Sequence, residues 1–197
     1  MAALLLKEQG YDVIGVTMKT WDGAESIIED AKRVADFLSI PYHVIDFTEE
    51  FHRYVVDYFA EEYLHGRTPN PCVVCNRHVK WEALLDRSRE FGAELVATGH
   101  YARVEKLQNG RYALRSSVTA AKDQTYALYN LTQDQLARTL MPVGSFEKEE
   151  IRRMAREAGI PVAEKPDSQE ICFIPDQDYA GFIERYTGKQ IQPGNFV

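Results

Sequence analysis

Apolar side chains alternate between two periods along the first hundred residues. Residues 11–18 and 42–47 are β-rich apolar runs typical of buried strands, and a third short run covers 94–98. Between them, residues 25–39 and 48–64 carry apolar positions at helical spacing. The apolar face of the first of these helices is formed by Ile28, Ala31, Val34, Ala35 and Leu38. Strand alternating with helix predicts an α/β fold, in which a parallel sheet has helices on both faces.

The second half of the chain has a different pattern. Two alternating runs flank Asn109-Gly110, so residues 101–116 are predicted to form a β-hairpin inserted into the α/β pattern. Helices are predicted over 132–139, 147–158 and 178–185. We therefore divide the chain into an α/β part, residues 1–130, and a helical part, residues 131–197.

Prolines frame two cysteines in the segment 67–76, Arg-Thr-Pro-Asn-Pro-Cys-Val-Val-Cys-Asn. Pro69 and Pro71 fix φ and restrict the residues before them, so residues 68–71 are predicted to be non-helical. A helix is expected to follow, with Cys72 and Cys75 near its N-terminus, where the partial positive charge favours thiolate. Cys75 is therefore a candidate nucleophile.

The remaining cysteine, Cys172, lies between Pro166 and Pro175. The apolar run 171–174 is long enough only for a brief strand or turn that holds the sulfur. Free cysteines are commonly small buried hydrophobic residues, and composition alone is compatible with that interpretation. The prolines beside each thiol favour a functional role for the cysteines over an inert one.

Composition limits the class of protein. The chain has 197 residues, of which 45% are hydrophobic and 27% charged, and no apolar run approaches the length of a membrane span. Three cysteines, an odd number, argue against a secreted disulfide framework and for a reducing compartment. We expect a cytoplasmic protein without a membrane partner.

Charge is unevenly distributed. The chain has a net charge of −7, yet residues 65–122 hold ten Lys/Arg against five Asp/Glu, a local net of +5. A basic segment around Cys72 and Cys75 would suit a polyanionic substrate, although such a run is about as often only a solvated face.

Five motifs, in order, resemble a known family, the bacterial tRNA-uridine 2-sulfurtransferases of the ATP pyrophosphatase superfamily. The resemblance covers nearly the whole chain. The motifs are Gly-Val-Thr-Met-Lys-Thr-Trp at 15–21, Gly-Arg-Thr-Pro-Asn-Pro-Cys-Val-Val-Cys-Asn at 66–76, Ala-Thr-Gly-His-Tyr-Ala at 97–102, Ala-Lys-Asp-Gln-Thr-Tyr at 121–126 and Pro-Asp-Ser-Gln-Glu-Ile-Cys-Phe-Ile at 166–174.

The resemblance implies a Rossmann-like fold of the adenine nucleotide alpha hydrolase type, with ATP and Mg²⁺ as cofactors. The implied reaction adenylates the C2 oxygen of the wobble uridine of tRNA, at position 34, and then transfers sulfur from a cysteine persulfide, releasing AMP. Cys75 would be the nucleophile and Cys172 the persulfide carrier. The implied partners are the tRNA anticodon loop, whose target base is splayed out, and a sulfur-relay donor protein.

Further residues take roles from the same resemblance. Those matching tRNA-contacting positions are Asn70, Pro71, Cys72, Lys122, Asp123 and Gln124. Met18 and Gly99 match positions that line the adenine nucleotide.

Cys72 stands where part of the family has an aspartate, and three interpretations are open. Cys72 is an inert loop residue, or it forms a redox dithiol with Cys75, or it joins Cys75 and Cys172 in holding a four-iron four-sulfur cluster. The ligand count fits a cluster, whereas the spacing alone does not show one.

The family's Ser-Gly-Gly-x-Asp-Ser loop, which holds the pyrophosphate of ATP, does not occur in this sequence. The family's central and C-terminal β-barrel portions are likewise absent. We therefore expect either a piece of a longer enzyme or a misassigned start, and no ATP turnover by this chain alone.

Three competing functions follow from the same residues. The Cys72-Val-Val-Cys75 segment has the spacing of a dithiol oxidoreductase, although that function leaves Cys172 unused. A zinc-bound module would need a fourth ligand, for which His65, His78 and His100 are available. A non-catalytic tRNA-binding remnant is the third.

Overall fold

Two pairs of parallel strands form the centre of the computed structural model, which describes residues 1–165 and 171–191. Strand β1 (Gly15–Lys19) pairs with β2 (Tyr42–Asp46), and β3 (Val96–Ala97) pairs with β6 (Thr139–Leu140). The predicted parallel α/β arrangement is confirmed, but in the described part of the chain the strands form two separate pairs instead of one continuous sheet.

An apolar cavity of about 120 Å³ lies where the two pairs face each other. Val16 and Ile45 from the first pair line it, together with Val96 and Ala97 from the second. Leu84 closes it from the helix above. Residues of both strand pairs therefore line the space between them.

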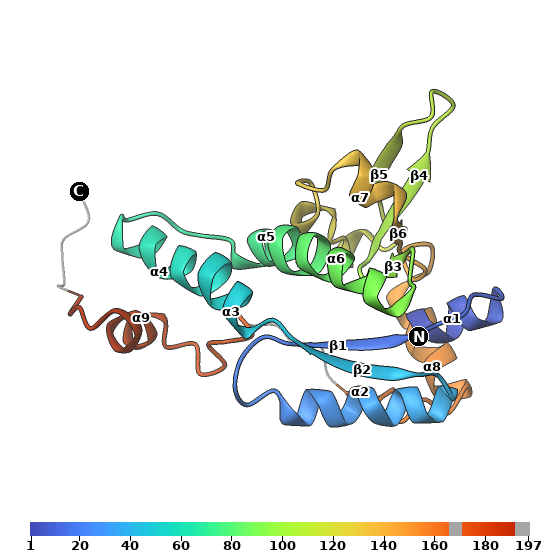
Figure 1. Cartoon of the computed structure of the whole chain (residues 1–197), viewed down its shortest axis with the longest axis horizontal. Helices are drawn as coiled ribbons and strands as arrows, with labels where there is room; N and C mark the ends of the chain where they lie inside the picture. Colours follow the sequence, from blue (N-terminus) through green and yellow to red (C-terminus); the bar gives the residue numbers. More distant parts are fainter. Residues whose placement is uncertain (166–170, 192–197) are drawn as a thin grey trace.

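Helices cover both faces of the β1–β2 pair, as predicted (Figure 1). Helix α2 (Glu25–Leu38) lies on one face, where its Ile28 carbonyl accepts a hydrogen bond of 3.1 Å from the Tyr42 hydroxyl. On the other face, Val79 is fully buried against Ile45, Phe47 and Phe51. This core fixes the helix that carries Cys75 above the strands.

The helix over that second face is continuous but changes type along its length. Its four segments are α5 (Pro71–Cys75), the π-helix η2 (Asn76–Ala83), α6 (Leu84–Ser88) and the 3₁₀ turn η3 (Arg89–Phe91). A π-helix bonds each N–H to a carbonyl five residues earlier, and π segments occur frequently at functional sites.

The helix predicted over 48–64 is confirmed and also contains a π segment. It consists of α3 (Thr48–Phe51), η1 (His52–Val56) and α4 (Asp57–Leu64). The Asp46 carboxylate caps its start by accepting a hydrogen bond of 2.9 Å from the backbone N–H of Thr48.

The predicted hairpin is confirmed as the antiparallel pair β4 (Ala102–Lys106) and β5 (Tyr112–Ser116), which projects from the body of the molecule (Figure 1). Its base is held by a close approach of backbones, because a Cβ at Gly144 would lie 1.7 Å from the Ala102 carbonyl oxygen. Only glycine fits there.

The helices predicted in the second half of the chain are present, but the first of them ends earlier than predicted. The remaining elements are α1 (Ala2–Glu8), the 3₁₀ turns η4 (Ala120–Lys122) and η5 (Thr125–Ala127), α7 (Gln133–Ala137), α8 (Lys148–Glu157) and α9 (Tyr179–Thr187). The helix expected over 132–139 ends early, because Thr139 and Leu140 pair with β3. The Arg138 carbonyl, just before β6, accepts a hydrogen bond of 2.9 Å from the Val96 N–H. Within the described residues, no helix has the length and apolar character needed to cross a bilayer.

Replacing Thr139 should destabilise the joint between η2 and β6. The fully buried Trp81 donates its indole N–H to the Thr139 hydroxyl at 2.7 Å, and that hydroxyl donates to the Gln135 carbonyl at 2.6 Å. Thr139→Val leaves the indole N–H unsatisfied, whereas the Gln135 carbonyl keeps the hydrogen bond of 3.2 Å from the Arg138 N–H. The free energy of unfolding should therefore fall by about 1–3 kcal/mol. Urea denaturation measures the loss.

Trp81→Phe in the Thr139→Val background is the control. If the indole hydrogen bond carries the loss, Trp81→Phe should cost less in that background than alone. Equal costs in the two backgrounds would contradict the assignment.

Candidate functional site: two thiols, a proline loop and an exposed aromatic segment

The loop before α5 is built to start a helix at a defined residue. Asn70 is the N-cap, and its side-chain oxygen accepts a hydrogen bond of 3.3 Å from the backbone N–H of Val73. Pro71 is the first helical residue, which corrects the prediction that residues 68–71 are all non-helical. A proline is accepted at that position because its missing N–H would have no intrahelical partner. Cys72 is therefore exposed in the first turn, and Cys75 ends α5.

Cys75 is half-buried, and its surroundings oppose ionisation. It packs against the core that contains Phe51 and Phe173. Burial raises the pKa of the Cys75 thiol, and the nearby positive charge of Lys80 only partly opposes that rise. The helix N-terminus was predicted to favour the thiolate of Cys75. In the structure the net shift of the Cys75 pKa is upward, because desolvation outweighs the nearby positive charge.

Cys172 reaches the same place from the far end of the chain. It lies in the turn 171–174, as one of the two predicted conformations requires, and the fully buried Ile174 anchors that turn. The adjacent Phe173 packs edge-on against Phe51 and Phe59, at centroid distances of 5.6 and 5.3 Å. Residues 166–170 of the same motif, including Pro166, lie outside the described residues.

The thiols interact with one another. The Cys172 sulfur keeps solvent contact, yet the protein around it raises its pKa to about 11, first through burial and then through the neighbouring Cys75 and Cys72. Lys80 again acts in the opposite direction. The structure thus brings together three cysteines, two of which are some 97 positions apart in sequence.

The described residues contain no group of three His, Cys, Asp or Glu arranged to hold a metal ion. In the described part of the chain, the three cysteines are therefore not arranged as a metal-holding group. The histidines considered as zinc ligands have other partners: His65 contacts the Glu61 carbonyl at 2.7 Å, His78 the Glu82 carboxylate at 2.6 Å and His100 the Thr98 hydroxyl at 2.8 Å.

Residues 122–124 match a tRNA-contacting segment, and the structure shows Lys122 exposed and Asp123 and Gln124 hydrogen-bonded within the protein. Lys122 is exposed at the end of η4. Gln124 accepts a hydrogen bond of 2.9 Å from the Tyr101 N–H, and Asp123 accepts bonds of 2.7 Å from Ser117 and 3.0 Å from Thr125. Burial would raise the pKa of Asp123, but these hydrogen bonds outweigh it and hold that pKa below its usual value. Asp123 and Gln124 therefore position the loop.

The two residues expected to line a nucleotide lie at the carboxyl ends of their strands. Met18 is the penultimate residue of β1 and packs on the core, and Gly99 is exposed just after β3. Carboxyl ends of parallel strands are where open α/β sheets bind ligands. A nucleotide role for both residues stays a prediction.

Sequence reasoning missed an exposed aromatic segment beside the thiols. Tyr126 and Tyr129 are 57% and 68% exposed. The buried Asn76, next to Cys75, donates a hydrogen bond of 3.1 Å to the Ala127 carbonyl and so holds this segment against the thiol helix. In the sequence the tyrosines look like core residues, and only their exposure distinguishes them.

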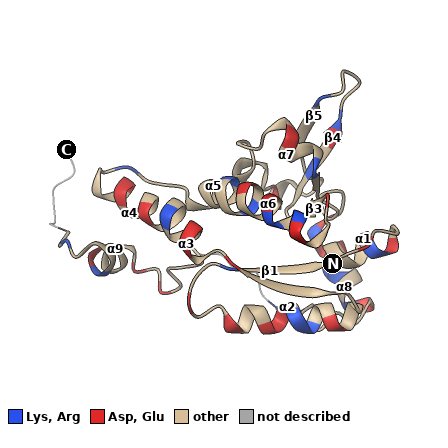
Figure 2. Cartoon of the chain, in the orientation of Figure 1, with Lys and Arg blue, Asp and Glu red and all other residues tan. Residues whose placement is uncertain are grey.

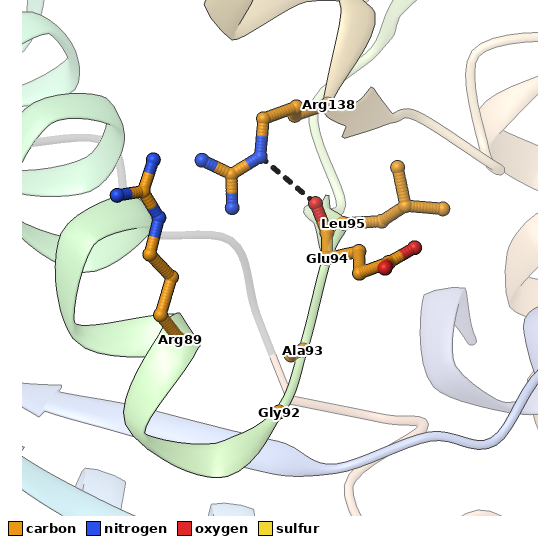
Figure 3. Close-up of a pocket in the computed structure, with 6 residues that line it drawn as sticks. All are labelled: Arg89, Gly92, Ala93, Glu94, Leu95 and Arg138. Atoms are coloured by element: carbon orange, nitrogen blue, oxygen red, sulfur yellow. Dashed lines mark hydrogen bonds between the residues drawn. The ribbon is translucent and has the colours of Figure 1, made fainter.

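A cavity of about 590 Å³ lies elsewhere (Figure 3). Arg89 and Arg138 point into it, and Arg138 donates a hydrogen bond of 2.9 Å to the Glu94 carbonyl. This cavity lies at the amino ends of β3 and β6, whereas ligands of such folds bind at the carboxyl ends. We therefore place the candidate site at the thiols.

Comparison with known proteins identifies the family of this chain. Residues 1–176 match the family model described as the tRNA methyl transferase HUP domain. The chain belongs to this family. That match contains all three cysteines, the proline loop and the segment 121–126, and it confirms the family resemblance drawn from the motifs.

Curated relatives match along the whole chain. A protein of Lachnoclostridium phytofermentans named tRNA-specific 2-thiouridylase MnmA is 61% identical over 100% of this chain, which covers 59% of that relative. Proteins of the same name from Clostridioides difficile and Clostridium acetobutylicum are 52% and 54% identical, with 58% and 59% of their lengths covered. The chain thus spans just under three fifths of these relatives.

The stability of this family member should depend on pH through His100. Burial, and then the charge of Lys80, lower the pKa of His100 to about 3. An unfolded imidazole has a pKa of about 6.5, so between these values the unfolded chain binds the extra proton. The free energy of unfolding should therefore fall as the pH is lowered from about 7 towards 4, and His100→Gln should reduce that slope.

Urea titrations at a series of pH values measure this dependence. The matched control is His65→Gln, which removes an imidazole from the exposed end of α4. An unchanged slope in His100→Gln would contradict the neutral buried state of this ring.

Proposed function

We propose that this chain forms the sulfur-transferring core of an enzyme that makes 2-thiouridine in tRNA. The supporting observation is the placement of Cys172 beside Cys75 by the packing of Phe173. Two thiols presented from separate segments suit the transfer of one sulfur atom, in which one cysteine carries the sulfur and the other releases it. The name shared by the relatives agrees with this chemistry.

The proposed reaction has two stages. Attack of the C2 oxygen of the wobble uridine on the α-phosphorus of ATP gives an adenylated base and pyrophosphate. The terminal sulfur of a Cys172 persulfide then attacks C2 and displaces AMP, leaving the base joined to Cys172 through a disulfide. The Cys75 thiolate attacks the Cys172 sulfur, which frees the thiolated base and forms a Cys75–Cys172 disulfide.

A second order of events uses the same atoms. Cys75 attacks the persulfide first, giving the Cys75–Cys172 disulfide and releasing hydrosulfide, which then displaces AMP from C2. In both orders the product disulfide must be reduced by an external dithiol before the next cycle. A persulfide donor protein reloads Cys172 with sulfur.

Several surface features support tRNA as the substrate. Asn70, Pro71 and Cys72 form the turn at the mouth of the thiol site, where a splayed-out base would arrive. Tyr126 and Tyr129 offer exposed rings for base stacking. Lys and Arg residues occur along the projecting hairpin, whereas α4 carries acidic residues (Figure 2). Lys122 is exposed at the end of η4, four positions before Tyr126 in the sequence.

ATP would bind at the carboxyl ends of the strands, with Met18 and Gly99 against the adenine nucleotide. The Ser-Gly-Gly-x-Asp-Ser loop expected to hold its phosphates is not in this sequence. Catalysis is therefore best tested in a chimera in which this chain replaces the matching segment of the Lachnoclostridium phytofermentans relative. We propose a cytoplasmic location, where tRNA and reduced thiols are both present.

Changing Cys75 in that chimera should abolish thiolation. With ATP, Mg²⁺, a persulfide donor and tRNA, the chimera should form 2-thiouridine, measured by mass spectrometry of digested tRNA. Cys75→Ser removes the group that breaks the bond to Cys172, so product should fall by at least about a thousandfold. Its circular dichroism should be unchanged.

The outcomes separate the competing functions. Retained activity in Cys75→Ser would contradict the nucleophile assignment, and an inactive chimera that still reduces disulfides would favour the Cys72–Cys75 dithiol. Tight tRNA binding without product would favour a binding-only role. Cys72→Ser decides whether Cys72 is inert or a redox partner of Cys75.

The affinity of this chain for tRNA should depend strongly on salt. Each phosphate contact releases counterions, so affinity should fall at least about tenfold between 50 and 200 mM KCl. Joint replacement of Lys106 and Arg111 by glutamine on the hairpin should reduce the salt slope by about one to two. Filter binding or fluorescence anisotropy measures this.

The matched control is Lys32→Gln, on the exposed side of α2, which should leave the slope unchanged. A flat salt dependence of the unmodified chain would argue against the basic segment as a tRNA-binding surface.

A further inference from the structure

Lys80 is the cation that faces both candidate sulfur residues, and the sequence pattern gave it no role. It lies in the π-helix η2, in which the N–H of Leu84 bonds to the carbonyl of Val79. The same five-residue register places Lys80 one turn from Cys75, on the same side of the helix. In an ordinary α-helix the two side chains would diverge, so the π segment aligns ammonium and thiol.

The neighbours of Lys80 lie in the other segments of the site. Trp81, the next residue, contacts the ring of His100 at a centroid distance of 5.6 Å, so this turn of η2 abuts the loop after β3. Cys75 and Phe173 pack on one core, which brings the 171–174 turn to the other end of the same helical face. Lys80 therefore lies between the segments that carry Cys75, Cys172 and His100.

No carboxylate neutralises this ammonium. Within residues 1–165 and 171–191, Lys80 forms no ion pair and no side-chain hydrogen bond. The nearest acid along the helix, Glu82, is engaged by Arg77 at 3.4 Å and His78 at 2.6 Å. Lys80 is half-buried, and a cation removed from water without a counter-ion is unfavourable, so an anion at this place would stabilise it.

The groups that face the thiols leave few sources for that anion. Cys75 is faced by Cys72 from α5 and Lys80 from η2, and Cys172 by both other cysteines and Lys80. His100 faces Lys80 from the loop after β3 and is neutral at ordinary pH. Among the described residues, the groups given as facing the thiols that can become negative are the sulfur atoms themselves.

We propose that Lys80 is the counter-ion of the sulfur anions at this site, the Cys75 thiolate and the anion on Cys172. Lys80 is a positioning residue in this role, because it acts on the reaction through the two cysteines. The proposal deepens the proposed function: sulfur transfer needs ionised sulfur in a pocket whose burial disfavours it. The fixed positive charge of Lys80 lowers the free energy of the sulfur anion, and Lys80 does not act as the base that removes the thiol proton.

The test is the pH dependence of thiol alkylation in this chain, without tRNA or ATP. Iodoacetamide labelling of Cys75 and Cys172 is followed by peptide mass spectrometry from pH 7 to 11. Lys80→Met should shift both midpoints to higher pH and slow labelling at pH 8 by about three- to tenfold, because one pKa unit corresponds to a tenfold change in thiolate. Lys80→Arg, which keeps the charge, should label at close to the unmodified rate.

Lys32→Met, the same change on the outer side of α2, is the matched control and should leave both profiles unchanged. Near-UV circular dichroism checks folding, and Lys80→Gln replaces Lys80→Met if the latter does not fold. Unchanged profiles in the neutral variant, or slowing in Lys80→Arg equal to that in Lys80→Met, would overturn the proposal.

The alkylation profile tests the role of Lys80 separately from the proposed tRNA thiolation. An inactive chimera together with a shifted profile would overturn tRNA thiolation while leaving Lys80 as counter-ion. An active chimera with an unchanged profile would overturn only the role of Lys80.

Discussion

The packing of Phe173 between Phe51 and Phe59 is the contact on which the site depends. Both partners are almost fully buried in the helix that follows β2, and both meet Phe173 edge-on. Such pairs add to the burial of apolar area, so this single ring fixes a short turn that has no regular structure of its own. Because Cys172 precedes that ring directly, apolar packing in the core determines where the second thiol lies.

Burial creates the chemical problem that the rest of the site must solve. The packing that brings Cys172 to Cys75 half-buries Cys75 and surrounds the exposed Cys172 with protein, and this burial raises the pKa of both thiols. Ionised sulfur is the reactive form, so a site of this kind needs positive charge that is not spent on a carboxylate. The π segment η2 places Lys80 in that position, while Glu82 is occupied by Arg77 and His78.

Sequence periodicity predicted the elements that bury a regular face. The helix with Ala35 and Leu38 inward, the hairpin around Asn109-Gly110 and the strands β1 and β2 all follow from local pattern and turn chemistry. The strand β6 did not follow, because two residues acquire strand geometry only by pairing with β3, far away in sequence. Pro71 was placed outside its helix because a proline rule for helix interiors was applied to the one position where proline is favoured.

The site was predictable in its residues but not in its electrostatics. Prolines and thiols at unusual spacing identified Cys75 and Cys172 as candidates, whereas the sign of the Cys75 pKa shift depends on how much water the fold removes. The π register that aligns Lys80 with Cys75 also has no sequence signature, since an α-helical pattern would place the two apart. Tyr126 and Tyr129 depend likewise on a tertiary bond, the one from Asn76 to Ala127, that turns their segment outward beside the thiols. The electric field around the sulfur atoms therefore comes from the fold, which buries the thiols and places Lys80, without an ion pair among the described residues, beside them.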